Sequence, residues 1–148
     1  MSCKAGSDGS AHVIVAVLIA LTLAFSVLVV HCHVNRWLID KRHGCGSALA
    51  LAGVCLLLVS LHLVEIALFA AGYELAGALG AGGFERPAEV RFMDVYYFSL
   101  ASYATLGLGK VMPTGHLAFI AGVEAIAGFL CITLSASTIF QAMQRRTD

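Results

Sequence analysis

Three long runs of uncharged, apolar residues constrain the fold of this chain more than any other feature. Residues 13–30 carry no charge, residues 47–73 are interrupted only by His62 and Glu65, and residues 117–140 only by Glu124. A helix of about 20 apolar residues crosses the roughly 30 Å hydrocarbon layer of a bilayer. We therefore expect an all-α integral membrane protein with three transmembrane helices, in contact with the lipid bilayer.

The composition excludes several other classes of protein. Hydrophobic residues make up 59% of the 148 residues and charged residues only 12%, which is about half the charged share of a soluble domain. Nine basic and nine acidic residues leave no net charge, so we expect no nucleic-acid partner. The five cysteines contain no C-x-x-C pair, which indicates neither a disulfide framework nor a zinc cluster. We expect no enzyme activity, small-molecule substrate or cofactor.

A fourth apolar segment, residues 92–105, is too short to span the membrane. It would reach only about 20 Å as a helix. The segment runs into a glycine-containing stretch, residues 107–110, which Pro113 follows. This order predicts a re-entrant helix and a loop that enter the membrane and return to the same side, and non-helical backbone at that depth must line a cavity.

Basic residues predict the orientation of the spans. Arg36, Lys41 and Arg42 crowd the loop between the first two apolar runs, and Arg145 and Arg146 follow the third. Because cytoplasmic loops carry an excess of Lys and Arg, we expect the N-terminus outside the cell (plasma or inner) membrane and the C-terminus in the cytoplasm. We also expect that no signal peptide is cleaved, since the basic flank and cleavage site of such a peptide are missing.

The short apolar segment leads directly into a T-x-G-x-G string. The string comprises Thr105, Leu106, Gly107, Leu108 and Gly109. A pore that strips water from a cation needs successive carbonyl oxygens turned toward one axis, and glycine adopts the required backbone conformations without a Cβ penalty. The preceding helix points the negative end of its dipole at the same place. These features together indicate a pathway for cations.

With these features the chain resembles the pore domain of the potassium channels, in which an outer helix, a pore helix, a T-V-G-Y-G-D signature and an inner helix follow one another. The resemblance covers roughly residues 51–140, and the chain is most similar to small bacterial members with a bare pore. It implies a pore domain over residues 47–148, with outer helix 47–73, pore helix 92–105, filter 105–109 and inner helix 117–140. Residues 1–46 would be an extracellular tail, an extra transmembrane helix and a cytoplasmic basic loop.

The resemblance also implies a function. Residues 105–109 would form the selectivity filter, in which carbonyl oxygens replace the hydration shell of the permeant K⁺. The ion would bind at Thr105, Leu106, Gly107 and Leu108. One chain supplies a quarter of the filter, so three identical subunits would complete a homotetramer that passes K⁺ passively. Gly128 lies where inner helices of the family often have a hinge glycine, although a membrane glycine also permits close helix approach.

Two positions depart from the family signature. Leu108 stands where the family usually has Tyr or Phe, and Lys110 stands at the outer mouth where it usually has Asp. These departures leave two alternatives open. One is a weakly selective or poorly conducting cation channel, and the other is a non-conducting membrane subunit that keeps the pore fold and acts by binding a partner.

Ionisable residues within the spans are costly and need partners. Counted along the helices, Glu124, Glu65 and His62 lie at similar depths. We expect Glu124 to brace the pore helix from behind through Ser102 and Tyr103, sharing a proton with Glu65 or His62, whereas the alternative is independent burial of each group.

Two further patterns leave their interpretation open. Small polar residues at helical spacing on the third span suit either a water-filled vestibule or close helix packing; they are Glu124, Gly128, Cys131, Ser135 and Thr138. His31, Cys32 and His33 at the end of the first span contain metal-ligand types. Adjacent helical residues point in different directions, however, which argues against a joint metal site.

Overall fold

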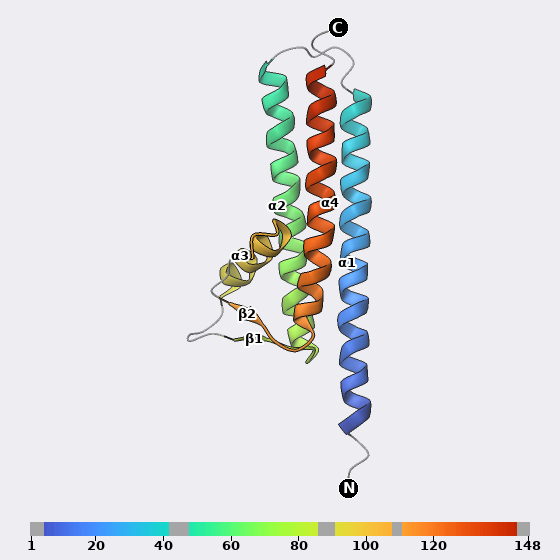
Figure 1. Cartoon of the computed structure of the whole chain (residues 1–148), viewed down its shortest axis with the longest axis vertical. Coiled ribbons are helices and arrows are strands. Elements are labelled where there is room, and N and C mark those ends of the chain that lie inside the picture. Colours follow the sequence, from blue (N-terminus) through green and yellow to red (C-terminus); the bar gives the residue numbers. More distant parts are fainter. Residues whose placement is uncertain (1–4, 42–47, 86–90, 108–110, 145–148) are drawn as a thin grey trace.

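The computed structural model describes residues 5–41, 48–85, 91–107 and 111–144. Three long helices lie side by side (Figure 1), namely α1 (Ala5–Lys41), α2 (Ala48–Ala78) and α4 (Leu117–Gln144). Each is long and apolar enough to cross a membrane. Hydrocarbon offers no partner for backbone polar groups, and a helix satisfies its own. The expected all-α membrane fold with three spanning helices is confirmed.

Helix α2 extends beyond its apolar run, because its end is set by a local backbone cap and not by the hydropathy of the sequence. The second helix was expected to end at residue 73, but α2 continues to Ala78. There Gly80 adopts a φ of +77°, and its N–H donates to the Gly77 carbonyl at 3.0 Å while the Ala81 N–H donates to Ala76 at 2.9 Å. This pair of bonds is a Schellman cap, which needs a left-handed residue. Helix α1 also extends beyond residues 13–30 at both ends, and α4 extends past residue 140 to Gln144.

The short helix α3 (Phe92–Tyr103) lies at the position predicted for the pore helix. It begins where the Arg91 N–H donates to Asp94 Oδ2 at 3.1 Å. The helix ends at Tyr103, two residues before the expected end at residue 105, because Thr105 has a φ of +56°. The Leu106 N–H then donates to the Ala101 carbonyl at 2.8 Å, which closes another Schellman turn.

A small antiparallel pairing, β1 (Phe84–Glu85) with β2 (Met112–Pro113), was not predicted. Two-residue strands are too short to give a periodic signal. The Thr114 N–H extends the pairing by donating to the Gly83 carbonyl at 2.8 Å, and the Gly83 N–H donates to Thr114 Oγ1 at 3.1 Å. The segment that returns from α3 is therefore tied to the end of α2.

The helices pack around one large apolar core, and a second, smaller cluster consists of Leu38, Val54 and Leu58. Helix α1 contacts both α2 and α4, and α3 leans against α2 and α4 on the side away from α1 (Figure 1). The beginning of α1 and the end of α4 lie at opposite ends of the bundle, as an odd number of crossings requires. Aromatic rings fill the space beneath α3, where Tyr73, Phe84 and Phe98 pack edge to face with centroids 5.3–5.7 Å apart.

Candidate functional site

The candidate site begins where α3 ends. Thr105 and Gly107 have φ values of +56° and +63°, so alternate residues of the T-x-G-x-G string lie in the left-handed region. A β-branched residue seldom adopts this conformation, and its presence marks a backbone held by its surroundings. Thr105, Leu106 and Gly107 are all exposed on the single chain. Leu108, Gly109 and Lys110 lie outside the described residues.

Helix α3 is anchored to α2 through backbone carbonyls. The Tyr96 hydroxyl donates to the Leu63 carbonyl at 3.0 Å, and the Ser99 hydroxyl lies 2.9 Å from the Ile66 carbonyl. Two side chains of α3, one turn apart, therefore bond to neighbouring turns of α2. These bonds fix how far α3 can rotate about its own axis, and so they fix where its C-terminal carbonyls point.

Gly128 permits the close approach of α3 to α4. A Cβ at this position would collide with the Tyr103 carbonyl oxygen and with the Tyr103 ring. Of the two interpretations of this glycine, the structure provides direct geometry for close packing. The remaining polar residues of the α4 stripe are also buried within the single chain, so this face of α4 packs against the other helices and does not line a vestibule.

Glu124 is buried against α2 and α3. Its Oε2 accepts a hydrogen bond from Tyr73 at 2.5 Å, and its Oε1 lies 2.5 Å from Ser99 Oγ. The carboxyl thus contacts the predicted pore helix through Ser99, in place of the expected Ser102 and Tyr103, and it contacts α2 through Tyr73. The reason is helical phase, since Ser99 and Tyr103 are one turn apart and each faces a different carboxyl.

Glu65 and His62 belong to a separate cluster, which we call the polar ring; its members are His31, Glu65, Tyr103, His62 and Ser135. His31 Nδ1 lies 2.9 Å from Glu65 Oε1, and the Tyr103 hydroxyl donates to Glu65 Oε2 at 2.5 Å. His62 Nδ1 lies 2.9 Å from the Tyr103 oxygen, and its Nε2 lies 3.1 Å from Ser135 Oγ. Ser135 Oγ is 3.1 Å from His31 Nε2, which closes the ring.

Counting donors in the polar ring leaves one proton to place. Because Tyr103 donates to Glu65, its oxygen accepts from His62 Nδ1. In the tautomer with its proton on Nδ1, His62 accepts the Ser135 hydroxyl proton at Nε2. Ser135 Oγ lies 3.1 Å from His31 Nε2, and because its own proton goes to His62 it accepts from His31 in this arrangement. The remaining proton lies between His31 Nδ1 and Glu65 Oε1, so the pair is neutral whichever side holds it. Neutral, fully bonded groups are those that a membrane interior tolerates.

The polar ring corrects the expected link between the two carboxyls. Glu124 bonds to Tyr73 and Ser99, whereas Glu65 bonds to His31 and Tyr103. The two carboxyls therefore belong to two distinct hydrogen-bond networks, and the expectation that Glu124 shares a proton with Glu65 or His62 is wrong. Both networks end on α3, one at its middle and one at its last residue.

Sequence reasoning missed the part played by His31. It treated His31, Cys32 and His33 as a set, but only His31 is buried while Cys32 and His33 are exposed. The sequence offered one signal, because His31 lies four residues, about one helical turn, before the polar residue Asn35 and so shares a face of α1 with it. Nothing in the sequence said which helix that face would meet.

Comparisons with known proteins bear on the segment from α2 to α4. A family model described as an ion channel matches residues 61–145, which is more than half of the chain. The inward rectifier potassium channel Kirbac3.1 of Paramagnetospirillum magnetotacticum is 36% identical over 92 residues. That match covers 62% of this chain and 30% of the relative, so the chain spans less than a third of the relative's length. No solved structure gives a significant match.

Proposed function

The chain belongs to the family of potassium-channel pore domains, and from that premise we propose that it forms a passive, potassium-selective ion channel. The observation that carries the proposal is the backbone at the end of α3. Left-handed φ values at Thr105 and Gly107 turn the chain out of the helix at the T-x-G-x-G string. Carbonyl oxygens there would take the place of the water that K⁺ loses.

The electrostatics at the end of α3 support the same function. The last carbonyls of a helix carry about half a negative elementary charge, and α3 ends at Tyr103, two residues before the string begins. Asp94 lies in the first turn of α3, at its positive end, and the last turn of α3 contains no basic residue. A cation near the membrane centre would be stabilised by this arrangement.

The functional unit would be a homotetramer. Thr105, Leu106 and Gly107 are exposed on the single chain, and a closed ring of carbonyls needs four copies of residues 105–109. Native mass measurement in lipid should give four chains. A stable monomer or dimer with no larger species would contradict the channel. We further propose that the tetramer lies in the cell membrane with the N-terminus outside.

Ion flux in liposomes tests the proposed selectivity. The purified protein should pass K⁺ much faster than Na⁺. Gly107→Ala should abolish this preference, because alanine is strained by about 1–2 kcal/mol at a left-handed φ. The matched control is Gly122→Ala on α4, since a Cβ at either glycine meets no atom within 4 Å. Equal loss in both variants would mean that the backbone at Gly107 has no special role.

Lys110 and Leu108 favour a second candidate, a weakly selective or poorly conducting cation channel. Similar K⁺ and Na⁺ fluxes would support it over the selective channel. A purified tetramer that passes no cation, even after Lys110→Asp, would instead indicate a non-conducting subunit that acts by binding a partner.

A further inference from the structure

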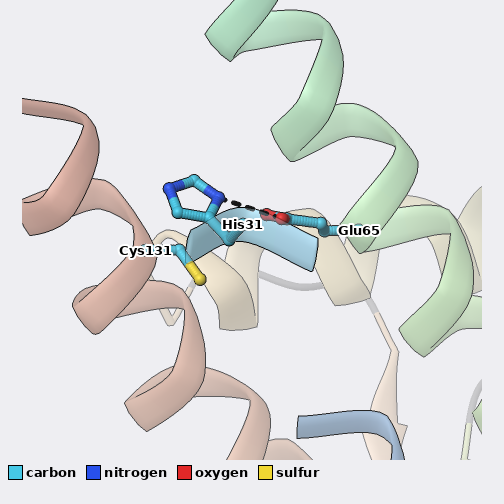
Figure 2. A group of neighbouring side chains, drawn as sticks. All are labelled: His31, Glu65 and Cys131. Carbon is cyan, nitrogen blue, oxygen red and sulfur yellow. Dashed lines mark hydrogen bonds and ion pairs between the residues drawn. The ribbon is translucent and has the colours of Figure 1, made fainter. Parts of the chain in front are cut away.

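Three metal-ligating side chains meet deep within the bundle, each from a different helix. Figure 2 shows His31 from α1, Glu65 from α2 and Cys131 from α4 next to one another. All are buried, with relative exposures of 0%, 1% and 0%. One ligand atom from each lies within 4.8 Å of the others. We propose that His31, Glu65 and Cys131 bind a divalent transition-metal ion of the Zn²⁺ type.

The position between His31 and Glu65 is where the ion would bind. His31 Nδ1 and Glu65 Oε1 are 2.9 Å apart, and the count of donors in the polar ring assigns a single proton to this contact. A metal ion takes the place of such a proton, since it uses the same nitrogen and oxygen lone pairs. Neighbouring ligands of a tetrahedral Zn²⁺ are about 3.5 Å apart, as its bond lengths of about 2.0–2.3 Å require. Binding therefore needs a small separation of this pair and a rotation of the thiol toward it.

The charges balance without any further group. The metal-free cluster holds one proton between His31 and Glu65 and one on the Cys131 thiol. Binding releases both protons, leaving a neutral imidazole, a carboxylate and a thiolate around a divalent cation. The net charge of the cluster is therefore the same before and after binding. This matters inside a membrane, where an uncompensated charge is strongly disfavoured.

The polar ring already supplies the groups that orient metal ligands. A ligating histidine usually donates its second N–H to a neighbouring acceptor, and His31 Nε2 lies 3.1 Å from Ser135 Oγ. The second oxygen of Glu65 accepts from Tyr103 at 2.5 Å. His31 Nδ1 and Glu65 Oε1 are thereby directed at the same point, and their partners can stay in place when the metal binds.

The ligand types indicate the class of ion. Thiolate and imidazole suit Zn²⁺ and similar transition metals, whereas Ca²⁺ and Mg²⁺ prefer oxygen ligands. The consequence would be structural. An ion bound to all three residues would link α1, which begins before the family match at residues 61–145, to α2 and α4, the long helices that come before and after the candidate filter in the chain.

Metal titration of the purified full chain tests the proposal. After treatment with a chelator, Co²⁺ is added as a spectroscopic probe. We expect a near-ultraviolet thiolate-to-Co²⁺ absorption band that saturates at one ion per chain and is removed by Zn²⁺. Cys131→Ser should abolish the band, and His31→Gln and Glu65→Gln should weaken binding at least about tenfold. Zn²⁺ should also raise the unfolding temperature of the unmodified protein.

Matched controls distinguish this site from other thiols and imidazoles. Cys55→Ser on α2 and His33→Gln on α1 should keep both the band and the stabilisation. The proposal is overturned if the unmodified chain gives neither the band nor the stabilisation, or if Cys131→Ser keeps the band. No ion flux enters the measurement, so failure of the metal site and failure of the channel function are separate results.

Discussion

The Tyr103 hydroxyl donates a hydrogen bond to Glu65 at 2.5 Å, and Tyr103 is the last residue of α3. The backbone of the same residue packs against Gly128. One tyrosine therefore connects the end of the pore helix to α2 through its side chain and to α4 through its carbonyl. Because Thr105 follows two residues later, the start of the candidate filter depends on both contacts.

Gly128→Ala tests the contact with α4. The added methyl group would collide with the Tyr103 carbonyl and ring, so we expect a loss of about 1–3 kcal/mol in the free energy of unfolding together with reduced K⁺ selectivity. Gly122→Ala is the control, since a Cβ there meets nothing within 4 Å. Chemical denaturation and liposome flux measure the two effects. If Gly128→Ala changes stability and selectivity no more than Gly122→Ala does, α3 and α4 do not approach each other this closely.

Tyr103→Phe tests the contact with α2. The substitution removes the donor to Glu65 Oε2 and leaves His62 Nδ1 without its acceptor, so we expect about 2 kcal/mol less unfolding free energy. Tyr97→Phe is the matched control on the same helix, because Tyr97 is 53% exposed. Equal stability of the two variants would show that the polar ring does not hold α3.

Glu124 should tolerate an amide better than an apolar side chain. Ser99 Oγ lies near both the Ile66 carbonyl and Glu124 Oε1, yet one hydroxyl proton serves only one of them. A protonated Glu124 satisfies both contacts by donating to Ser99, and the amide of Glu124→Gln can do the same. We expect Glu124→Gln to keep stability and K⁺ selectivity.

Glu124→Leu should instead weaken both properties. It leaves Tyr73 and Ser99 buried without their partner, at a cost of about 1–3 kcal/mol for each group. Glu74→Leu on α2 serves as the exposed control. Thermal unfolding and flux assays decide the outcome. If leucine is accepted at 124 with unchanged stability and selectivity, or if a reagent in the pore labels a cysteine placed there, Glu124 does not brace α3.

Lys110→Asp should raise inward K⁺ conductance, most strongly at low ionic strength. Four ammonium groups at about 8 Å would oppose an entering cation by about 2 kcal/mol in water, and physiological salt reduces this to about 1 kcal/mol. Single-channel recording over a range of salt concentrations measures the effect. Equal conductance of both proteins at every concentration would place Lys110 away from the ion path.

Much of the architecture could be predicted because hydropathy is a local property. Three apolar runs were enough to predict α1, α2 and α4, and the brevity of residues 92–105 distinguished α3 from a span. The helix ends were less predictable, because caps at Gly80 and Thr105 end α2 and α3. A threonine at a left-handed cap position gives no signal in the sequence, where glycine is the usual residue.

The sequence by itself thus determined the membrane class, the number of spans and the place of the T-x-G-x-G string, since each follows from residues that are neighbours along the chain. Only the tertiary structure decided which polar groups meet. His31 and Ser135 are 104 residues apart yet 3.1 Å from each other, and Ser99 and Tyr103 face different carboxyls although one helical turn separates them. Such contacts depend on how each helix is rotated about its axis, which is set by the packing of all the helices at once.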